Sequence, residues 1–203
     1  MWRMRLTGKP LWVILGPTAV GKTGLATALA ERLDAEIVSA DSRQVYRYMD
    51  IGTAKPTPEQ QAAVPHHLID IVDPAKDLSL AQVQRMAYDA INAIHARGKL
   101  PLLVGGTGQY ISAIIDGWSI PAVPPNDALR AELEAFAAEH GAQALHDRLR
   151  ALDATAADAI PYKNIRRVVR ALEVCIEAGQ PISELQRKSP PPYDVRVDGL
   201  TLD

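Results

Sequence analysis

The segment from Gly16 to Thr23 constrains the fold of this chain more than any other. It reads GPTAVGKT and matches the pattern G-x-x-x-x-G-K-[ST]. A short apolar run, Leu11–Leu15, precedes it, and apolar side chains at helical spacing follow it, which predicts a strand, a loop and a helix in that order. In such a loop, successive backbone N–H groups and the helix N-terminus face an anion. The segment therefore predicts a cradle for a di- or triphosphate.

Two residues of this segment carry specific chemistry. Lys22 adds a full positive charge to the partial charge of the helix N-terminus. Thr23 is predicted to place its hydroxyl on a Mg²⁺ ion whose other ligands are mostly phosphate oxygens and water. The predicted diphosphate- or nucleotide-binding residues are Gly16, Pro17, Thr18, Ala19, Val20, Gly21, Lys22 and Thr23.

The first half of the chain alternates short apolar runs with helical patterns. Glu36–Ser39, His67–Ile71 and Leu102–Val104 are predicted strands, and Ser79 is placed to cap a helix over Leu80–Arg97. Strands that alternate with helices are typical of a parallel sheet covered by helices. We therefore predict an α/β fold of the P-loop NTPase type, with a parallel sheet and helices on both faces.

Beyond the middle of the chain, prolines mark a change in the sequence pattern from alternating strands and helices to helical periodicity alone. Pro121, Pro124 and Pro125 form a stiff connector, Asn126 is predicted to cap a helix, and helical periodicity then continues to about Leu185. This stretch is rich in Ala, Glu and Leu. It predicts a small all-α insertion.

A second proline cluster, Ser189–Pro192, ends the helical pattern. Val195–Leu202 is then predicted to return to the sheet as one more strand. The predicted domains are an α/β core over residues 1–120, a helical insertion over 121–188, and a return to the core over 189–203.

Composition limits the classes of function. The chain is 47% hydrophobic and 23% charged, as in ordinary globular proteins, and its net charge of −2 gives no overall attraction to nucleic acid. An RNA-binding role therefore requires a local basic patch. The single cysteine, Cys175, excludes an internal disulfide and a cysteine-rich zinc site. Without a recognisable signal peptide or membrane span, we expect a cytoplasmic monomer with no membrane partner.

One segment supplies such a basic patch. Lys163, Arg166, Arg167 and Arg170 recur at i, i+3, i+4 and i+7, which places them on one face of a helix. Apolar side chains are predicted on the opposite face: Ile165, Val168, Val169, Leu172 and Ile176. The pattern alone leaves two interpretations open, an RNA phosphate contact and a solvated helix surface.

The segment Asp41–Tyr46 (DSRQVY) follows the second predicted strand. Its polar side chains are therefore expected at the carboxyl edge of the sheet beside the phosphate cradle, where open α/β sheets bind ligands. Asp41 at this edge is either a reactive carboxylate or a helix N-cap, and the residues alone do not decide between these roles.

Three further features bear on the site. Thr107 lies in a GGT loop, where a threonine hydroxyl commonly bonds the backbone of its own turn. Asp70 and Asp73 follow an apolar run, as metal-binding carboxylates do. These residues are interpreted either as metal ligands or as carboxylates that bind no metal. Asp50–Pro56 (DIGTAKP) is polar and glycine-containing, which predicts an exposed loop.

Taken together, six blocks in this order resemble the tRNA dimethylallyltransferase family. The resemblance extends from about Leu11 to the end of the chain. The blocks are GPTAVGKT at 16–23, DSRQVY at 41–46, DIGTAKP at 50–56, PHHLID at 65–70, GGTGQY at 105–110 and RRVVRALEV at 166–174. The first is common among ATPases, but DSRQVY followed by DIGTAKP is not a general P-loop feature.

The resemblance implies a reaction. A dimethylallyl group passes from dimethylallyl diphosphate to the N6 amine of an adenine next to the anticodon of tRNA, and Mg²⁺ helps the diphosphate to leave. The implied partners are dimethylallyl diphosphate and the anticodon stem-loop of tRNA. By family position Asp41 is the general base, and Thr107 lines the channel in which donor and adenine meet.

The resemblance also implies which residues contact tRNA. A flipped-out adenine and its neighbours are expected to meet the segment after the second strand, and the basic helix is expected to meet RNA phosphates. The implied tRNA-binding residues are Asp41, Ser42, Arg43, Gln44, Arg166, Arg167, Val168, Val169 and Arg170.

Two departures from the family pattern stand out. Gln109 occupies a position that is usually apolar in relatives, and the chain ends before the C-terminal part that relatives carry. We therefore expect a shortened family member. Three other functions remain as alternatives: a P-loop kinase of a small metabolite, a prenyltransferase acting on free adenylate, and a non-catalytic RNA- or nucleotide-binding fragment.

Overall fold

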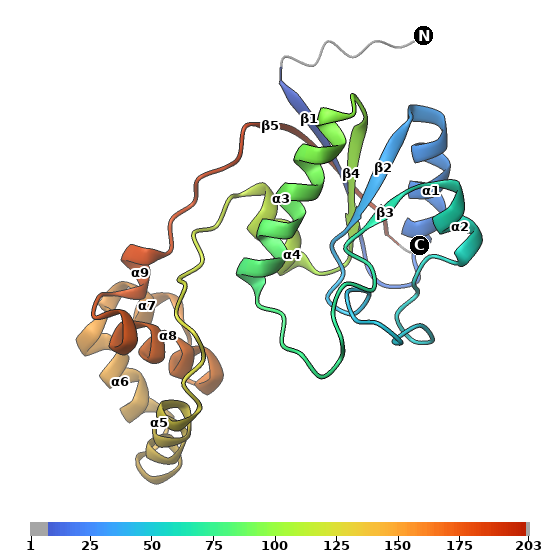
Figure 1. The fold of residues 1–203 in the computed structure, drawn as a ribbon. Coiled ribbons are helices and arrows are strands. Elements are labelled where there is room, and N and C mark those ends of the chain that lie inside the picture. The colour runs from blue at the N-terminus through green and yellow to red at the C-terminus, as the bar shows by residue number, and fades with distance from the viewer. Residues whose placement is uncertain (1–7, 202–203) are drawn as a thin grey trace. The chain divides into compact units, whose positions relative to one another are not determined.

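The computed structural model describes residues 8–201 and divides the chain into two compact units (Figure 1). The first unit is Met1–Gly117 together with Ser189–Asp203, and the second is Trp118–Lys188. Within residues 8–201, no helix is both long enough and apolar enough to cross a membrane.

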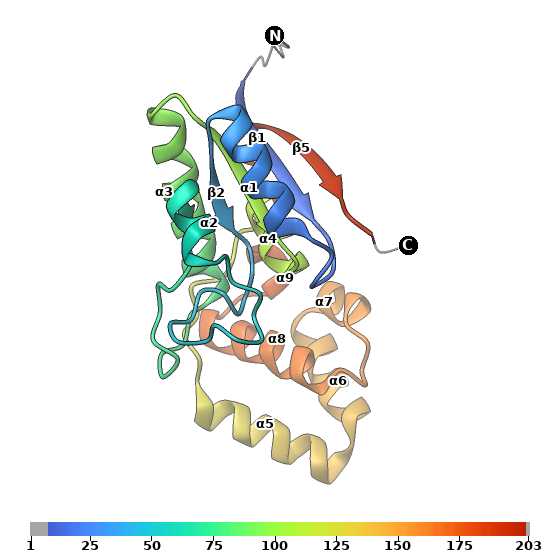
Figure 2. The same ribbon diagram turned by 90° about the vertical axis from the view of Figure 1, so that its right-hand side faces the viewer.

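The first unit contains a five-stranded sheet in which all paired strands run parallel. The strand order is β3-β2-β4-β1-β5, and Figure 2 shows β5 beside β1 at one edge. This is the predicted P-loop type of α/β fold. The strands are β1 (Lys9–Leu15), β2 (Ala35–Ser39), β3 (His66–His67), β4 (Leu100–Gly105) and β5 (Tyr193–Gly199).

Successive side chains of the central strands point to opposite faces of the sheet, so a hydrophobic core forms on each face. Val13, Val38 and Leu103 pack on one face against α3 (Leu80–Ala96) and α4 (Gly108–Ile115). Their chain neighbours turn to the other face, where Ile14, Ile37 and Leu102 pack against α1 (Lys22–Leu33). A short helix, α2 (Pro58–Ala63), precedes β3. The sheet is therefore covered on both faces, as the sequence predicts.

Local signals account for where several elements begin and end. Ser79 caps α3 in a reciprocal capping box with Gln82, which confirms the predicted start of that helix. The predicted strand over His67–Ile71 is wrong beyond His67, because Leu68 and Asp70 adopt left-handed backbone conformations with φ of 63° and 55°. Of the strand predicted over Val195–Leu202, Leu202 lies outside the described residues.

From Asp127 to Leu185 the second unit consists of helices joined by short loops, as predicted from its periodicity. Asn126 caps its first helix by accepting a hydrogen bond from the N–H of Leu129. The helices are α5 (Asp127–His140), α6 (Ala142–Leu152), α7 (Ala154–Ala159), α8 (Ile165–Ala178) and α9 (Ile182–Leu185). The central helix is α8, whose buried Val168, Leu172 and Cys175 contribute to the core of this unit.

Candidate functional site

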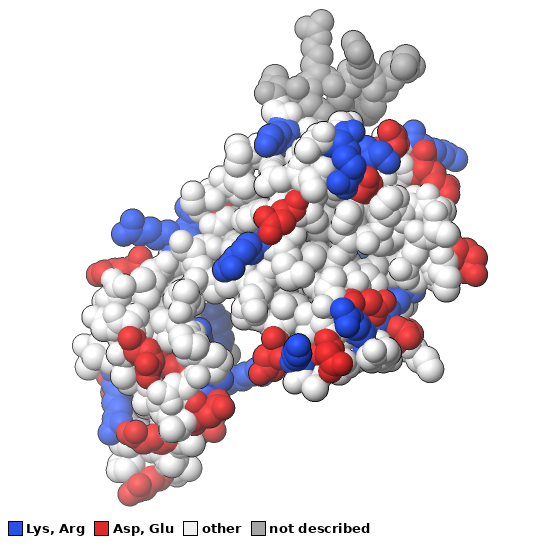
Figure 3. Space-filling model, viewed as in Figure 1, with Lys and Arg blue, Asp and Glu red and all other residues white. Residues whose placement is uncertain are grey.

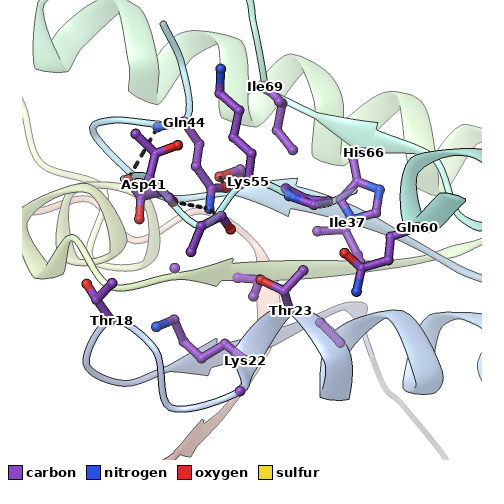
Figure 4. A pocket seen from close by; sticks show the side chains of 18 of the residues that line it. Thr18, Lys22, Thr23, Ile37, Asp41, Gln44, Lys55, Gln60, His66 and Ile69 are labelled. Atoms are coloured by element: carbon purple, nitrogen blue, oxygen red, sulfur yellow. Dashed lines mark hydrogen bonds between the residues drawn. The ribbon is translucent and has the colours of Figure 1, made fainter. Parts of the chain in front are cut away.

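A cavity of about 280 Å³ lies at the carboxyl ends of the strands in the first unit (Figure 4). Three parts of the chain supply most of its lining: the phosphate cradle, the ends of β2 and β4, and the loop that follows β2. The lining residues used below are Thr18, Ala19, Gly21, Lys22, Thr23, Ile37, Ser39, Asp41, Gln44, Thr53, Ala54, Lys55, Pro56, Gln60, His66 and Ile69.

The cradle has the backbone that its motif requires. Ala19 and Gly21 adopt left-handed conformations with φ of 68° and 88°, and α1 begins directly afterwards at Lys22. The chain also passes close behind the cradle, because a Cβ on Gly16 would lie 2.6 Å from the carbonyl oxygen of Leu200. Glycine is therefore required at that position for steric reasons.

The ammonium group of Lys22 lies across the cradle. Its Nζ donates hydrogen bonds to the carbonyl oxygens of Gly16 at 2.9 Å and Pro17 at 2.6 Å. Burial lowers the pKa of Lys22, and the charge of Asp41 partly opposes this shift. Of the eight residues predicted to bind diphosphate, Thr18, Ala19, Gly21, Lys22 and Thr23 line the cavity.

Asp41 caps a turn rather than a helix, because turns and no helix follow it directly. Its Oδ1 accepts hydrogen bonds from the backbone N–H groups of Arg43 at 2.8 Å and Gln44 at 3.4 Å, so this oxygen holds the turn that follows β2. Within residues 8–201, no donor contacts Oδ2. Because Asp41 also lines the cavity, one carboxylate oxygen remains available to a ligand.

The Thr107 hydroxyl does not bond the backbone of its own turn, so that interpretation is wrong. Its Oγ1 accepts a hydrogen bond of 3.0 Å from the N–H of Ser42, and its own N–H donates to the carbonyl oxygen of Ala40. The close approach of the two strand ends depends on Gly105, because a Cβ there would lie 2.2 Å from the carbonyl oxygen of Ala40. Thr107 therefore ties the loop after β4 to the segment that carries Asp41, although it is not among the lining residues.

Lys55 is a feature of the site that the sequence did not reveal. The surrounding loop was predicted to be exposed, yet the Lys55 side chain is only 5% exposed. Its Nζ donates hydrogen bonds to the carbonyl oxygen of Tyr46 at 2.7 Å, to Asp50 at 2.7 Å and to Asp70 at 2.6 Å. Burial lowers the pKa of Lys55, but the bonds to Asp50 and Asp70 outweigh it and leave the pKa raised. One buried ammonium group therefore joins the loop after β2 to the segment after β3.

Gln44 connects the end of β2 to Thr53 and Ala54 through its side-chain amide. Its Oε1 accepts a hydrogen bond from Ser39 Oγ at 2.9 Å. Its Nε2 donates to the carbonyl oxygens of Thr53 at 3.1 Å and Ala54 at 3.0 Å. Gln44 is predicted to contact an adenine, but its side-chain amide is already engaged in these three hydrogen bonds. Ser42 and Arg43, predicted to contact the same adenine, are not among the lining residues.

Asp70 and Asp73 do not form a metal site with the cradle. Asp70 is paired with Lys55, and Asp73 accepts a hydrogen bond from the N–H of Ala75. Neither lines the cavity. The described residues also contain no group of three or more His, Cys, Asp or Glu side chains suited to hold a metal ion.

His66 is a second feature that sequence reasoning missed. Its Nδ1 lies 2.8 Å from the carbonyl oxygen of Val64, which requires a proton on that nitrogen. Burial lowers the pKa of His66, which favours the neutral ring. Its Nε2 is a buried acceptor without a hydrogen-bond partner among the described residues, and in Figure 4 the ring lies near Gln60 and Ile37.

The helical unit places the predicted basic face in two different environments. Arg166 and Arg167 are exposed at the start of α8, whereas Arg170 is partly buried, is paired with Glu173 and donates to the carbonyl oxygen of Val123 at 3.1 Å. Lys163 is exposed just before the helix. In the view of Figure 3, basic and acidic side chains are interspersed over this unit.

Two predictions for α8 need correction. Val168 and Val169, included in the implied tRNA-binding set, are 0% and 3% exposed, so their side chains pack in the core and offer RNA no surface. Ile165 and Ile176 were expected on the buried face but are 37% and 47% exposed. The burial of this helix therefore centres on Val168 to Cys175 rather than on the whole apolar stripe.

Glu173 explains why part of the basic face turns inward. Its carboxylate is fully buried and accepts hydrogen bonds from Arg130 at 2.8 and 3.0 Å, from the N–H of Asn126 at 2.7 Å, and from Arg170. Burial raises the pKa of Glu173, but these donors outweigh it and leave the pKa lowered. A buried carboxylate needs such compensation, and Arg170 supplies part of it.

Comparison with known families and proteins agrees with the six sequence blocks. A family model described as IPP transferase matches residues 44–203, and one described as isopentenyl transferase matches residues 9–71. A tRNA dimethylallyltransferase of Roseiflexus castenholzii is 59% identical over 193 residues, which are 95% of this chain and 63% of the relative. One of Chloroflexus aggregans is 59% identical over 187 residues, 92% of this chain and 63% of the relative.

Solved structures extend the similarity to the fold. The full-length tRNA isopentenylpyrophosphate transferase of Bacillus halodurans matches with a TM-score of 0.59 and 48% identity over 94% of this chain and 59% of that one. A eukaryotic dimethylallyltransferase acting on tRNA matches with a TM-score of 0.78 and 28% identity over 95% of this chain and 48% of that one. The chain thus spans less than two thirds of the length of these relatives. By the family match over residues 44–203 and the identity to curated relatives, this chain belongs to the IPP transferase family.

Proposed function

We propose that this chain carries the catalytic core of a tRNA dimethylallyltransferase. The observation that supports this most directly is that Asp41 and the cradle residues Lys22 and Thr23 line one cavity. A diphosphate bound in the cradle would lie near a carboxylate with a free oxygen. The relatives named for this reaction are 59% identical to the chain.

The proposed reaction exchanges one bond for another. The C–O bond between the prenyl group and diphosphate breaks, and the diphosphate leaves with the electron pair. The N6 amine of adenine then forms a C–N bond with the primary carbon of the allyl cation. As that bond forms, the amine proton becomes acidic and passes to Asp41 Oδ2, because Oδ1 is already engaged by the turn.

The remaining cavity residues bind and orient the donor in this proposal. Lys22 neutralises part of the diphosphate charge, and backbone N–H groups of Thr18 to Thr23 surround the phosphate oxygens. Thr107 holds the Ser42 amide, and so keeps the Asp41 segment in position. Gln44 and Lys55 hold the opposite wall.

A Mg²⁺ ion fits the donor set at the cradle. Thr23 is a lining residue at the start of α1, and no carboxylate cluster is needed when phosphate oxygens and water supply most ligands. When bound, the ion would neutralise charge on the departing diphosphate.

We propose the anticodon stem-loop of tRNA as the second substrate. The target adenine must leave its stack to reach the cavity, and Arg43, Arg166 and Arg167 are exposed cations available to RNA phosphates. We also propose that the active species is a monomer.

The test is transfer of radiolabel from dimethylallyl diphosphate to tRNA, to an isolated anticodon stem-loop, or to AMP. Label in tRNA and stem-loop supports the proposal. Label in AMP alone would assign the chain to prenylation of free adenylate. Lys22→Ala serves as the control, because it should weaken donor binding far more than tRNA binding. A chain that binds neither the donor nor RNA would contradict the proposal.

A further inference from the structure

The two most exposed large apolar side chains among residues 8–201 lie three positions apart in one loop. Tyr48 is 79% exposed and Ile51 is 98% exposed, whereas the next, Leu152, is 49% exposed. The same loop continues into Thr53, Ala54 and Lys55, which line the cavity. Single exposed apolar residues are ordinary, but two extreme cases beside a ligand cavity indicate a contact surface.

The loop that carries these side chains is well braced from within. Thr53 Oγ1 donates to the carbonyl oxygen of Met49 at 2.6 Å, and Gln44 and Lys55 hold the loop against the rest of the cavity wall. Tyr48 adopts a left-handed backbone with φ of 63°, a costly conformation for an aromatic residue. Because the loop is already ordered, binding of a partner to Tyr48 and Ile51 costs little free energy of loop ordering.

The exposed charges of this loop favour an anionic partner. Arg43 and Arg47 are exposed in the same loop, and Arg47 uses its Nε to donate to the carbonyl oxygen of Asp70, which leaves its terminal nitrogens for other acceptors. The nearby carboxylate of Asp50 is paired with Lys55. A loop that carries an exposed aromatic ring and two exposed arginines matches single-stranded nucleic acid, in which bases stack and phosphates carry the charge.

We infer that Tyr48 and Ile51 form a stacking surface for the nucleobases that flank the target adenine. The inference rests on the proposed function, because flipping one adenine out of a loop exposes the faces of its neighbours and forfeits their stacking. The Tyr48 ring stacks on one base face that flipping exposes, and Ile51 covers the other exposed face. The loop thereby recognises unstacked RNA. A duplex has no exposed base faces of this kind and a free mononucleotide has no neighbouring bases, so neither binds this surface.

The experiment measures binding of an anticodon stem-loop in which 2-aminopurine replaces a base next to the target adenine. Stacking quenches the fluorescence of this base, so the signal reports the contact independently of catalysis. Tyr48→Asn removes the ring but suits a left-handed backbone, Tyr48→Phe retains the ring, and Ile51→Ser removes the second apolar group. Leu33→Ser is the matched control, since Leu33 is 44% exposed at the far end of α1.

We expect Tyr48→Asn to raise the stem-loop Kd by about 5- to 100-fold and to relieve the quenching, as removal of one base–aromatic stack does. Ile51→Ser should have a smaller effect of the same kind. Tyr48→Phe and Leu33→Ser should bind like the unmodified chain, and the KM for dimethylallyl diphosphate should not change.

Unaltered binding and quenching in both Tyr48→Asn and Ile51→Ser would overturn the inference. If Tyr48→Asn unfolds, as judged by circular dichroism, Ile51→Ser decides alone. Failure of the proposed function is separable, because the unmodified chain would then transfer no label to any RNA. Loss of vesicle binding in both variants, with RNA binding intact, would assign the surface to lipid and would also overturn the inference.

Discussion

Lys55 Nζ lies 2.6 Å from Asp70 Oδ1, and this pair joins the loop after β2 to the segment after β3. The ammonium is almost fully buried, whereas the Asp70 side chain is 42% exposed. Removing the cation therefore leaves a carboxylate that water can still reach, together with an unpaired carbonyl oxygen of Tyr46.

We expect Lys55→Met to lower the free energy of unfolding by about 1 to 3 kcal/mol, because it breaks three hydrogen bonds to one buried charge. The KM for dimethylallyl diphosphate should also rise, since Ala54 and Pro56 line the cavity on either side of Lys55. Urea denaturation and steady-state kinetics measure the two effects. Lys99→Met is the control, because Lys99 also pairs with carboxylates but lies away from the cavity. An unchanged KM in Lys55→Met would show that the loop does not depend on this pair.

Asp41 offers a way to separate its two roles. Asp41→Asn keeps an oxygen that can accept from Arg43 and Gln44 but removes the base, so turnover should fall about 10²- to 10⁴-fold while donor affinity is retained. Asp41→Ala should show the same fall in turnover and also loosen the turn. Single-turnover rates and donor binding by calorimetry give the comparison. Full turnover in Asp41→Asn would assign the proton to another group.

The arginines of α8 should respond differently to neutral substitution. Arg166→Gln and Arg167→Gln are expected to weaken tRNA binding. Each should also reduce the slope of log affinity against log salt by about 0.7 for every single-stranded RNA phosphate that the arginine neutralises in the unmodified chain. Neither should change stability, because both side chains are exposed.

Arg170→Gln should instead destabilise the helical unit, because it removes one of the donors to the buried carboxylate of Glu173. Salt titrations of tRNA affinity and thermal melts followed by circular dichroism distinguish the two classes. Equal salt slopes in all three variants and the unmodified chain would leave α8 without a role in RNA binding.

Glu36 should make the protein sensitive to acid. This carboxylate is 3% exposed in β2 and is bonded to Arg97 and His67. Burial raises its pKa, but these partners outweigh burial and bring the pKa to about 2, below the value of 4.5 for a free glutamate. Because the unfolded chain binds the proton more readily, the stabilisation is present above pH 4.5 and is lost as the pH falls toward 2.

The shift corresponds to roughly 3 kcal/mol, and Glu36→Gln should abolish that part of the pH dependence. Denaturant unfolding at several pH values compares the variant with the unmodified chain. A difference in stability that stays constant from neutral pH down to pH 2 would contradict the assignment.

Much of the local structure could be predicted from short segments of the sequence. The cradle, the Ser79 and Asn126 caps and the alternation of strands with helices each depend on residues close together in the chain. Backbone sterics, capping hydrogen bonds and hydrophobic periodicity act over a few residues, so the sequence carries them directly. The same holds for the position of Asp41 at the carboxyl edge of the sheet.

The tertiary structure decided which polar side chains face the cavity and which face each other. Lys55 and Asp70 are 15 residues apart, and Thr107 and Ser42 are 65 apart, so no local pattern distinguishes these pairs from solvated residues. Arg170 likewise resembles Arg167 in the sequence, yet it turns inward because α5 and α8 enclose Glu173 between them. A side chain's partner depends on which distant segments folding brings within hydrogen-bond reach, and that information exists only once the chain has packed.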